Sequence, residues 1–138
     1  MLKLMSAIVV AALCLGCRSE DVDLRVRVLV PAEIPSVASG LLRMSLWAYD
    51  PHLADAPSSL VDAASLSFAH TKGEQNEVSM TVHGNVPSGA RSYITVRGFE
   101  LLPSGEKYIL WDGLEGLGTP TTIVMRPVSA VSMAGFVD

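Results

Sequence analysis

The sequence contains very little cysteine, with two residues in a chain of 138, both in its N-terminal segment. They form Cys14-Leu15-Gly16-Cys17, the C-x-x-C spacing of a redox pair or of half a zinc site. A redox pair of this kind needs a βαβ context, and a zinc site needs further ligands nearby. An apolar N-terminal segment offers neither, so we interpret the motif as part of a targeting signal.

The residues before the motif have the order of a secretory signal. Lys3 supplies one early positive charge, residues 4–15 are uncharged and almost wholly apolar, and the small Gly16 follows. Twelve helical residues rise only about 18 Å, against a hydrocarbon core of roughly 30 Å, so we expect no permanent transmembrane helix. Cys17 stands where a bacterial lipoprotein signal is cut and its new N-terminal cysteine is lipidated. We therefore expect residues 1–16 to be a lipoprotein signal peptide and Cys17 to carry a lipid anchor, with a plain cleaved signal as the alternative.

The mature chain that this cleavage would leave has no second cysteine and little basic charge. With Cys17 blocked by its thioether, no disulfide can form, so stability must come from the core. The 122 residues from Cys17 to Asp138 suit one domain, which we expect to be a monomer. Loss of Lys3 leaves 9 basic against 14 acidic side chains, a net charge of −5, which gives no basic footprint for nucleic acid. We expect residues 17–22 to be a polar tether and residues 23–138 to be the folded domain.

Familiar motifs of catalysis are also missing from the sequence. No serine stands in G-x-S-x-G, and the chain has no phosphate-binding loop, dinucleotide fingerprint or H-E-x-x-H pair. It also has no internal repeat, no run of like charges and no low-complexity segment. We therefore expect a protein without catalytic residues and without a cofactor.

Apolar and polar residues alternate along much of the chain, which predicts β-strands with one face in a core and one in water. Residues 23–30 alternate in this way, and so do residues 42–49, where Leu46 would face the core and Trp47 and Tyr49 would point outward. Residues 58–69 fit either a short helix or a strand, and we favour an irregular lead-in followed by a strand. The other predicted strands are residues 78–82, 93–99, 107–111, 121–126 and 130–137.

Turn-forming residues separate the predicted strands. They occur at residues 71–73, 83–85, 86–89 and 103–105. About seven or eight short strands with such frequent turns indicate an all-β protein, and we predict a single antiparallel β-sandwich. His70 and His83 lie near the ends of predicted strands, so we expect both to be exposed turn residues.

The stretch densest in candidate functional residues is residues 46–57, LWAYDPHLADAP, where a strand runs into a proline-bounded loop. Asp50, His52 and Asp55 could supply oxygen and nitrogen ligands to a divalent ion. In the simpler interpretation, which we favour, Asp50 and Asp55 bond their own backbone and shape the turn. A metal-dependent binding module or enzyme that uses this loop is the alternative function.

The segment from Leu53 to Pro57, L-A-D-A-P, resembles the corresponding loop of the YbaY type of envelope lipoprotein and of the related YscW type of type III secretion pilot lipoprotein. The resemblance spans about Leu24 to Trp111. It implies a small β-sandwich behind a lipidated cysteine, located in the bacterial cell envelope at the outer membrane and facing the periplasm. It implies no catalytic residues, and a non-catalytic binding, pilot or chaperone-like role in which a segment of an outer-membrane secretin is carried to its site of assembly.

Trp47 and Tyr49 are the strongest candidates for contact with a partner. If Leu46 and its alternate neighbours form the core, these two aromatics share the opposite face of one strand. Exposed aromatics on a sheet face can form a docking patch for an apolar peptide. The alternative is that a twisted sandwich buries both faces of the strand, or that Trp47 belongs to the core and the phase is reversed.

Overall fold

Residues 19–53, 55–115 and 121–128, which the computed structural model describes, form eight strands and no helix. The predicted all-β class is therefore confirmed. No helix in these residues is long and apolar enough to cross a membrane. The strands are β1 (Ser19–Val30), β2 (Val37–Tyr49), β3 (Ser59–His70), β4 (Asn76–Pro87), β5 (Arg91–Leu102), β6 (Gly105–Glu115), β7 (Thr121–Val124) and β8 (Arg126–Pro127).

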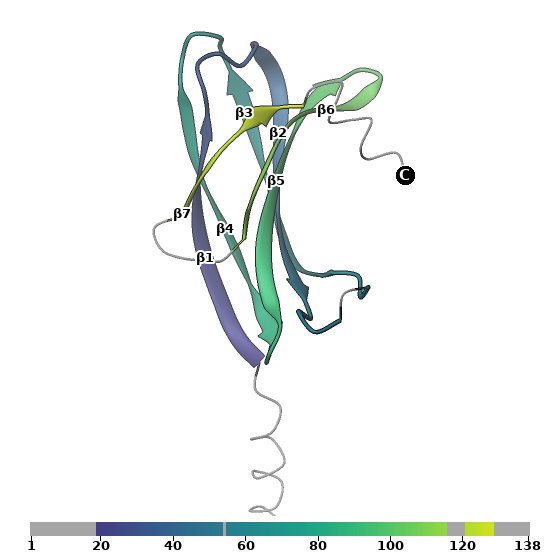
Figure 1. Cartoon of the computed structure of the whole chain (residues 1–138). Helices are drawn as coiled ribbons and strands as arrows, with labels where there is room; N and C mark the ends of the chain where they lie inside the picture. Colours follow the sequence, from purple (N-terminus) through teal and green to yellow (C-terminus); the bar gives the residue numbers. More distant parts are fainter. Residues whose placement is uncertain (1–18, 54, 116–120, 129–138) are drawn as a thin grey trace, which may run out of the picture.

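The strands form two sheets that face each other across a shared core, as Figure 1 shows. One sheet has the order β4-β1-β7 and the other the order β3-β2-β5-β6-β8. This arrangement confirms the predicted β-sandwich. Neighbouring strands are antiparallel except for β1 and β7, which pair in parallel and which the pattern of the sequence did not distinguish.

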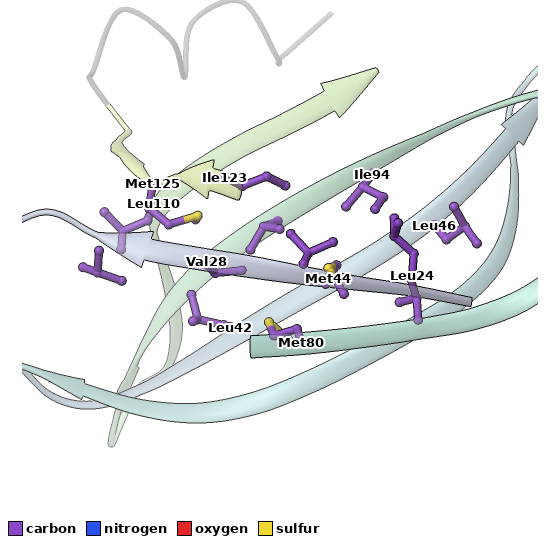
Figure 2. Close-up of a cluster of buried hydrophobic side chains, with 14 of the residues drawn as sticks. Leu24, Val28, Leu42, Met44, Leu46, Met80, Ile94, Leu110, Ile123 and Met125 are labelled. Atoms are coloured by element: carbon purple, nitrogen blue, oxygen red, sulfur yellow. The ribbon is translucent and has the colours of Figure 1, made fainter. Parts of the chain in front are cut away.

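Strand β2 divides its side chains between the core and the outer surface. Leu42, Met44 and Leu46 are each 0% exposed, and the residues between them are half-buried on the opposite face. The alternation predicted for this strand is therefore confirmed. Figure 2 shows labelled core side chains between the two layers. The buried cluster draws on both sheets: Leu24, Val26, Val28, Val30, Ile34, Leu42, Met44, Leu46, Met80, Val82, Ile94, Val96, Leu110, Ile123 and Met125.

Three of the four predicted turns are confirmed. Gly73, Gly89 and Gly105 have φ angles of 97°, 82° and 124°, which favour glycine over any residue with a side chain. The fourth prediction, a turn at residues 83–85, is wrong because these residues continue β4. Gly84 is required there for another reason: a Cβ atom at this position would lie 2.5 Å from a methyl group of Val61, so glycine permits β3 and β4 to approach closely.

The boundaries of several predicted strands also change. The helical alternative for residues 58–69 is wrong, because β3 is a strand that pairs with β2 through a register shift opposite Leu46 and Trp47. Residues 19–22, expected in the tether, already pair with β4. The predicted strand 121–126 is interrupted at Met125, whose N–H donates to the carbonyl of Leu29 at 2.8 Å, and Arg126 begins β8 in the other sheet. Residues 1–16, Cys17 and the predicted strand 130–137 lie outside the described residues.

His70 is buried, with 3% of its surface accessible, so the prediction of an exposed turn residue is wrong. Its Nε2 lies 3.0 Å from the carbonyl oxygen of Ile34, which can only accept, so Nε2 donates. Its Nδ1 then accepts from the side-chain amide of Asn76 at 2.7 Å. Both ring nitrogens are satisfied, which is the condition for burying a polar ring at low cost. His83 is exposed as expected, but it belongs to β4 and not to a turn.

Replacement of Leu46 tests this assignment of the core. Leu46→Ala should lower the free energy of unfolding by about 2–5 kcal/mol, because it leaves a cavity in a fully buried site. Leu60→Ala is the matched control on the neighbouring strand, since Leu60 is 55% exposed, and it should cost less than about 1 kcal/mol. Urea unfolding of both variants measures the difference, and equal losses would contradict the assignment.

Candidate functional site

The outer surface of the five-stranded sheet gathers most of the aromatic residues of the chain. Trp47 on β2 pairs with Tyr93 on β5, and Phe99 on β5 pairs with Tyr108 on β6. Paired residues on adjacent strands point to the same face, which here is the face opposite the buried Leu46. We call this surface the aromatic face. It carries six of the eight aromatic residues in the sequence: Trp47, Tyr49, Tyr93, Phe99, Tyr108 and Trp111.

Ring contacts and hydrogen bonds hold these side chains in place. Trp47 stacks on Tyr93, with ring centroids 6.4 Å apart and planes 15° apart, and Tyr49 tilts against the same tyrosine at 5.9 Å. The indole Nε1 of Trp47 donates to Thr95 Oγ1 at 2.9 Å, and the Tyr93 hydroxyl donates to Ser58 Oγ at 3.0 Å. Aromatic side chains fixed in this way lose little further entropy when a partner covers them.

Arginines lie over three of the rings. The guanidinium carbon of Arg43 is 5.0 Å from the ring centroid of Phe99. The guanidinium of Arg97 lies 5.8 Å from Tyr108, and that of Arg126 lies 4.6 Å from Trp111, so each pair is within the range of a cation–π interaction. The aromatic face therefore presents apolar surface and positive charge together.

Burial and a nearby positive charge shift the pKa of the Tyr108 hydroxyl in opposite directions. Partial burial raises the pKa of this phenol above its ordinary value, and the nearby Arg97 opposes the rise. Burial has the larger effect. The phenol therefore stays neutral at physiological pH, and Tyr108 adds no negative charge to the face.

A row of small side chains crosses the aromatic face. Ala63, Ser45, Thr95 and Gly113 are register partners on β3, β2, β5 and β6. A hollow of about 230 Å³ lies at the β3 end of the row and one of about 600 Å³ at the β6 end, and Thr95 lines both. We call the two hollows together the trough. Arg43, Arg97 and Trp111 occupy the register positions on one side of the row, and Trp47 and Tyr93 those on the other.

The loop between β2 and β3 forms the end wall of the larger hollow. Asp50, Leu53 and Ala56 line it from the loop, together with Tyr49 and Tyr93. A second space, of about 790 Å³, opens on the other side of this loop, toward the turn between β4 and β5. The loop lies at the end of the sandwich where β1 begins (Figure 1).

The structure shows Asp50 shaping the loop. Its Oδ1 accepts from the backbone N–H of His52 at 2.9 Å, and its carbonyl accepts from Leu53 N–H at 3.2 Å. This agrees with the turn-forming role that we favour for Asp50. His52 and Asp55 are exposed. Within the part of the chain that the structure describes, no group of three or more histidine, cysteine, aspartate or glutamate side chains is placed to hold a metal ion.

Trp47 and Tyr49 point to the outer face, as the strand pattern predicted. Trp47 is half-buried while Leu46 is fully buried, so the reversed phase is wrong. Sequence reasoning missed the other aromatics and the arginines of this face. The signal that could have found part of them is the same two-residue period, which places Tyr93, Thr95, Arg97 and Phe99 on one side of β5. That the face binds a partner stays a prediction.

Comparisons with known proteins give a likeness in fold. No protein-family profile matches the chain, and no curated protein matches it in sequence. Among solved structures, it is similar to an alternative pilotin from the type II secretion system of Vibrio cholerae. The TM-score is 0.55 at 15% sequence identity, over 80% of this chain and 100% of the pilotin. This likeness supports a pilotin-like fold, and it does not assign the chain to the YbaY or YscW type.

The metal hypothesis has a direct test. Calcium or zinc added to the protein should leave its melting temperature unchanged, because Asp50 already accepts a hydrogen bond from its own loop. An ion bound to the native state alone would raise the melting temperature with its concentration, by mass action. A concentration-dependent rise that Asp50→Ala or Asp55→Ala abolishes would contradict this expectation and establish the loop as a metal site.

Proposed function

We propose that this protein is a pilot-like lipoprotein of the bacterial cell envelope, which binds a segment of a secretin-like outer-membrane component without catalysis. The observation that carries the proposal is the likeness in fold to a secretion pilotin over the whole length of that pilotin. The order of the N-terminal residues, with Cys17 after an apolar segment, supports an envelope location.

The aromatic face is the surface that we assign to this binding. It combines fixed aromatic rings, positive charge and a trough. Its Trp47 lines the smaller hollow and stacks on Tyr93, which lines the larger one, so we assign Trp47 the part of the central anchor. Interfaces draw most of their binding free energy from a few such residues, with tryptophan, tyrosine and arginine the most frequent. The chain contributes all three residue types to this one face.

The anchor assigned to Cys17 is tested by replacing its thiol. Cys17→Ser should leave the chain unlipidated and release it from membranes, because only a thiol at this position can take the diacylglyceryl group. Several acyl chains, at about 0.8 kcal/mol for each buried methylene, hold a protein stably, and one chain alone holds it weakly. Labelling with fatty acid and fractionation measure the effect, with Cys14→Ser as the control that should change neither. A serine variant that still incorporates label would contradict the assignment.

The binding role is tested by capture of a secretin from the solubilised envelope of the same cells. Trp47→Ala should weaken this capture roughly thirtyfold, since a central aromatic anchor contributes about 2 kcal/mol or more at an interface. His52→Ala is the control for the neighbouring loop and should capture normally. Thermal unfolding of each preparation shows whether the variants are folded.

Two outcomes would contradict this assignment. If Trp47→Ala captures the secretin as the parent does, with an unchanged melting temperature, the aromatic face is not the binding surface. If His52→Ala alone loses capture, the binding surface is the loop between β2 and β3.

A further inference from the structure

We infer that the trough on the aromatic face binds an acidic segment of a polypeptide, in which carboxylates that contact Arg43 and Arg97 alternate with apolar side chains that pack on Trp47 and Tyr93. This inference rests on the proposed function, because it names the chemistry of the segment that such a pilot would hold.

The two arginines beside the row of small residues, Arg43 and Arg97, repel each other in the folded protein. Arg43 and Arg97 are direct register partners on β2 and β5, and like charges directly opposite each other destabilise a sheet. Among the described side chains no carboxylate forms an ion pair with Arg97, and Arg43 has only Glu106 at 3.6 Å. Carboxylates bound to each of them would relieve this repulsion.

Basic side chains gather on one part of this face, although the protein as a whole is acidic. The chain has a net charge of −4, yet Arg43, Arg91, Arg97 and Arg126 all lie on or beside the register rows of this face. Glu106 and Asp112 pair with two of them, and Asp50 lines the larger hollow. An acidic segment would therefore be attracted to the Arg43 and Arg97 side of the trough.

The shape of the trough favours an extended segment over a compact anion. The arginines lie over different rings on separate strands, so their donors do not converge on one point. The row from Ala63 to Gly113 crosses four strands, a span of about 14 Å at ~4.8 Å between strands, which matches about four residues of extended chain. Arginine forks then fit carboxylates on one side, and the stacked rings accept apolar side chains on the other.

Fluorescently labelled synthetic peptides added to the purified full-length protein test the inference. The probe alternates glutamate with leucine, and its two controls replace every glutamate by lysine or every leucine by serine. Anisotropy should show binding of the glutamate–leucine peptide, weaker binding of the serine peptide and none of the lysine peptide. The affinity should fall as ionic strength rises, because the contacts are between charges. A preference for the lysine peptide, or equal binding of all three, would overturn the inference.

A pair of double variants locates the binding on the protein. Arg43→Gln with Arg97→Gln should weaken binding of the glutamate–leucine peptide at least about tenfold. The melting temperature should stay close to that of the parent, because removal of the like-charge pair offsets the loss of the exposed contacts that the two arginines make with Phe99, Tyr108 and Glu106. The matched control, Arg25→Gln with Arg27→Gln, removes two exposed arginines from β1 and should bind as the parent does. Arg27 pairs with Glu77, but exposed ion pairs of this kind contribute little to stability. Equal weakening in both double variants would overturn the inference.

Two further measurements compare the peptide with a membrane surface and with the secretin. The protein should not bind vesicles of phosphatidylglycerol through Arg43 and Arg97. If it binds these vesicles through the two arginines and does not bind the peptide, the face is a membrane-binding surface and the inference is overturned. Secretin capture by the Arg43 and Arg97 double variant at the level of the parent would also overturn it and leave the proposed function standing. If the parent protein binds the peptide but captures no secretin, the result would support the trough as the binding site for an acidic segment and contradict the proposed function.

Discussion

The structure depends on the two-residue period of β2, the strand next to the centre of the larger sheet. The 13 residues of β2 contribute to both the core and the candidate site, since Met44 faces inward while its neighbours Arg43 and Ser45 face outward. A slip of one residue in the pairing of β2 would place Arg43 and Trp47 in the core and Leu46 in water. Burial of the aliphatic side chains therefore fixes which residues of β2 face outward.

Much of the fold could be predicted from local pattern. Alternation found β2 and most other strands because one face of each is packed against the opposite sheet, and glycine-containing turns marked three of the connections between strands. The local sequence pattern gave wrong predictions where a contact with a residue far away in the sequence determines the local structure. Gly84 looked like a turn residue, but glycine is needed there because the side chain of Val61 leaves no room for a Cβ atom. His70 looked exposed because its hydrogen-bond partners Ile34 and Asn76 come from other parts of the chain.

The candidate site was predictable only in its first strand. Trp47 and Tyr49 follow from the phase of β2, but the row of arginines depends on how strands pair, which a single sequence does not reveal. Trp111 meets Arg97 only because a bulge shifts the register between β5 and β6, and Arg126 reaches Trp111 from a short strand that the sequence pattern merged with β7. For the same reason the net charge of the chain, which gave no basic footprint, did not reveal that several arginines gather on one face.

The early start of β1 sets how far an anchored domain could move. A chain lipidated at Cys17 would have Arg18 alone between the anchor and the first paired residue, Ser19, so the domain would be held by a very short connection. The end of the sandwich that carries the exposed Leu53 would then rest near the lipid headgroups. Ser45 lies four residues from the end of β2, so the trough would open sideways about 13 Å above that end of the strand. A partner segment would have to arrive along the membrane surface, and segments held far out in the periplasm would be beyond reach.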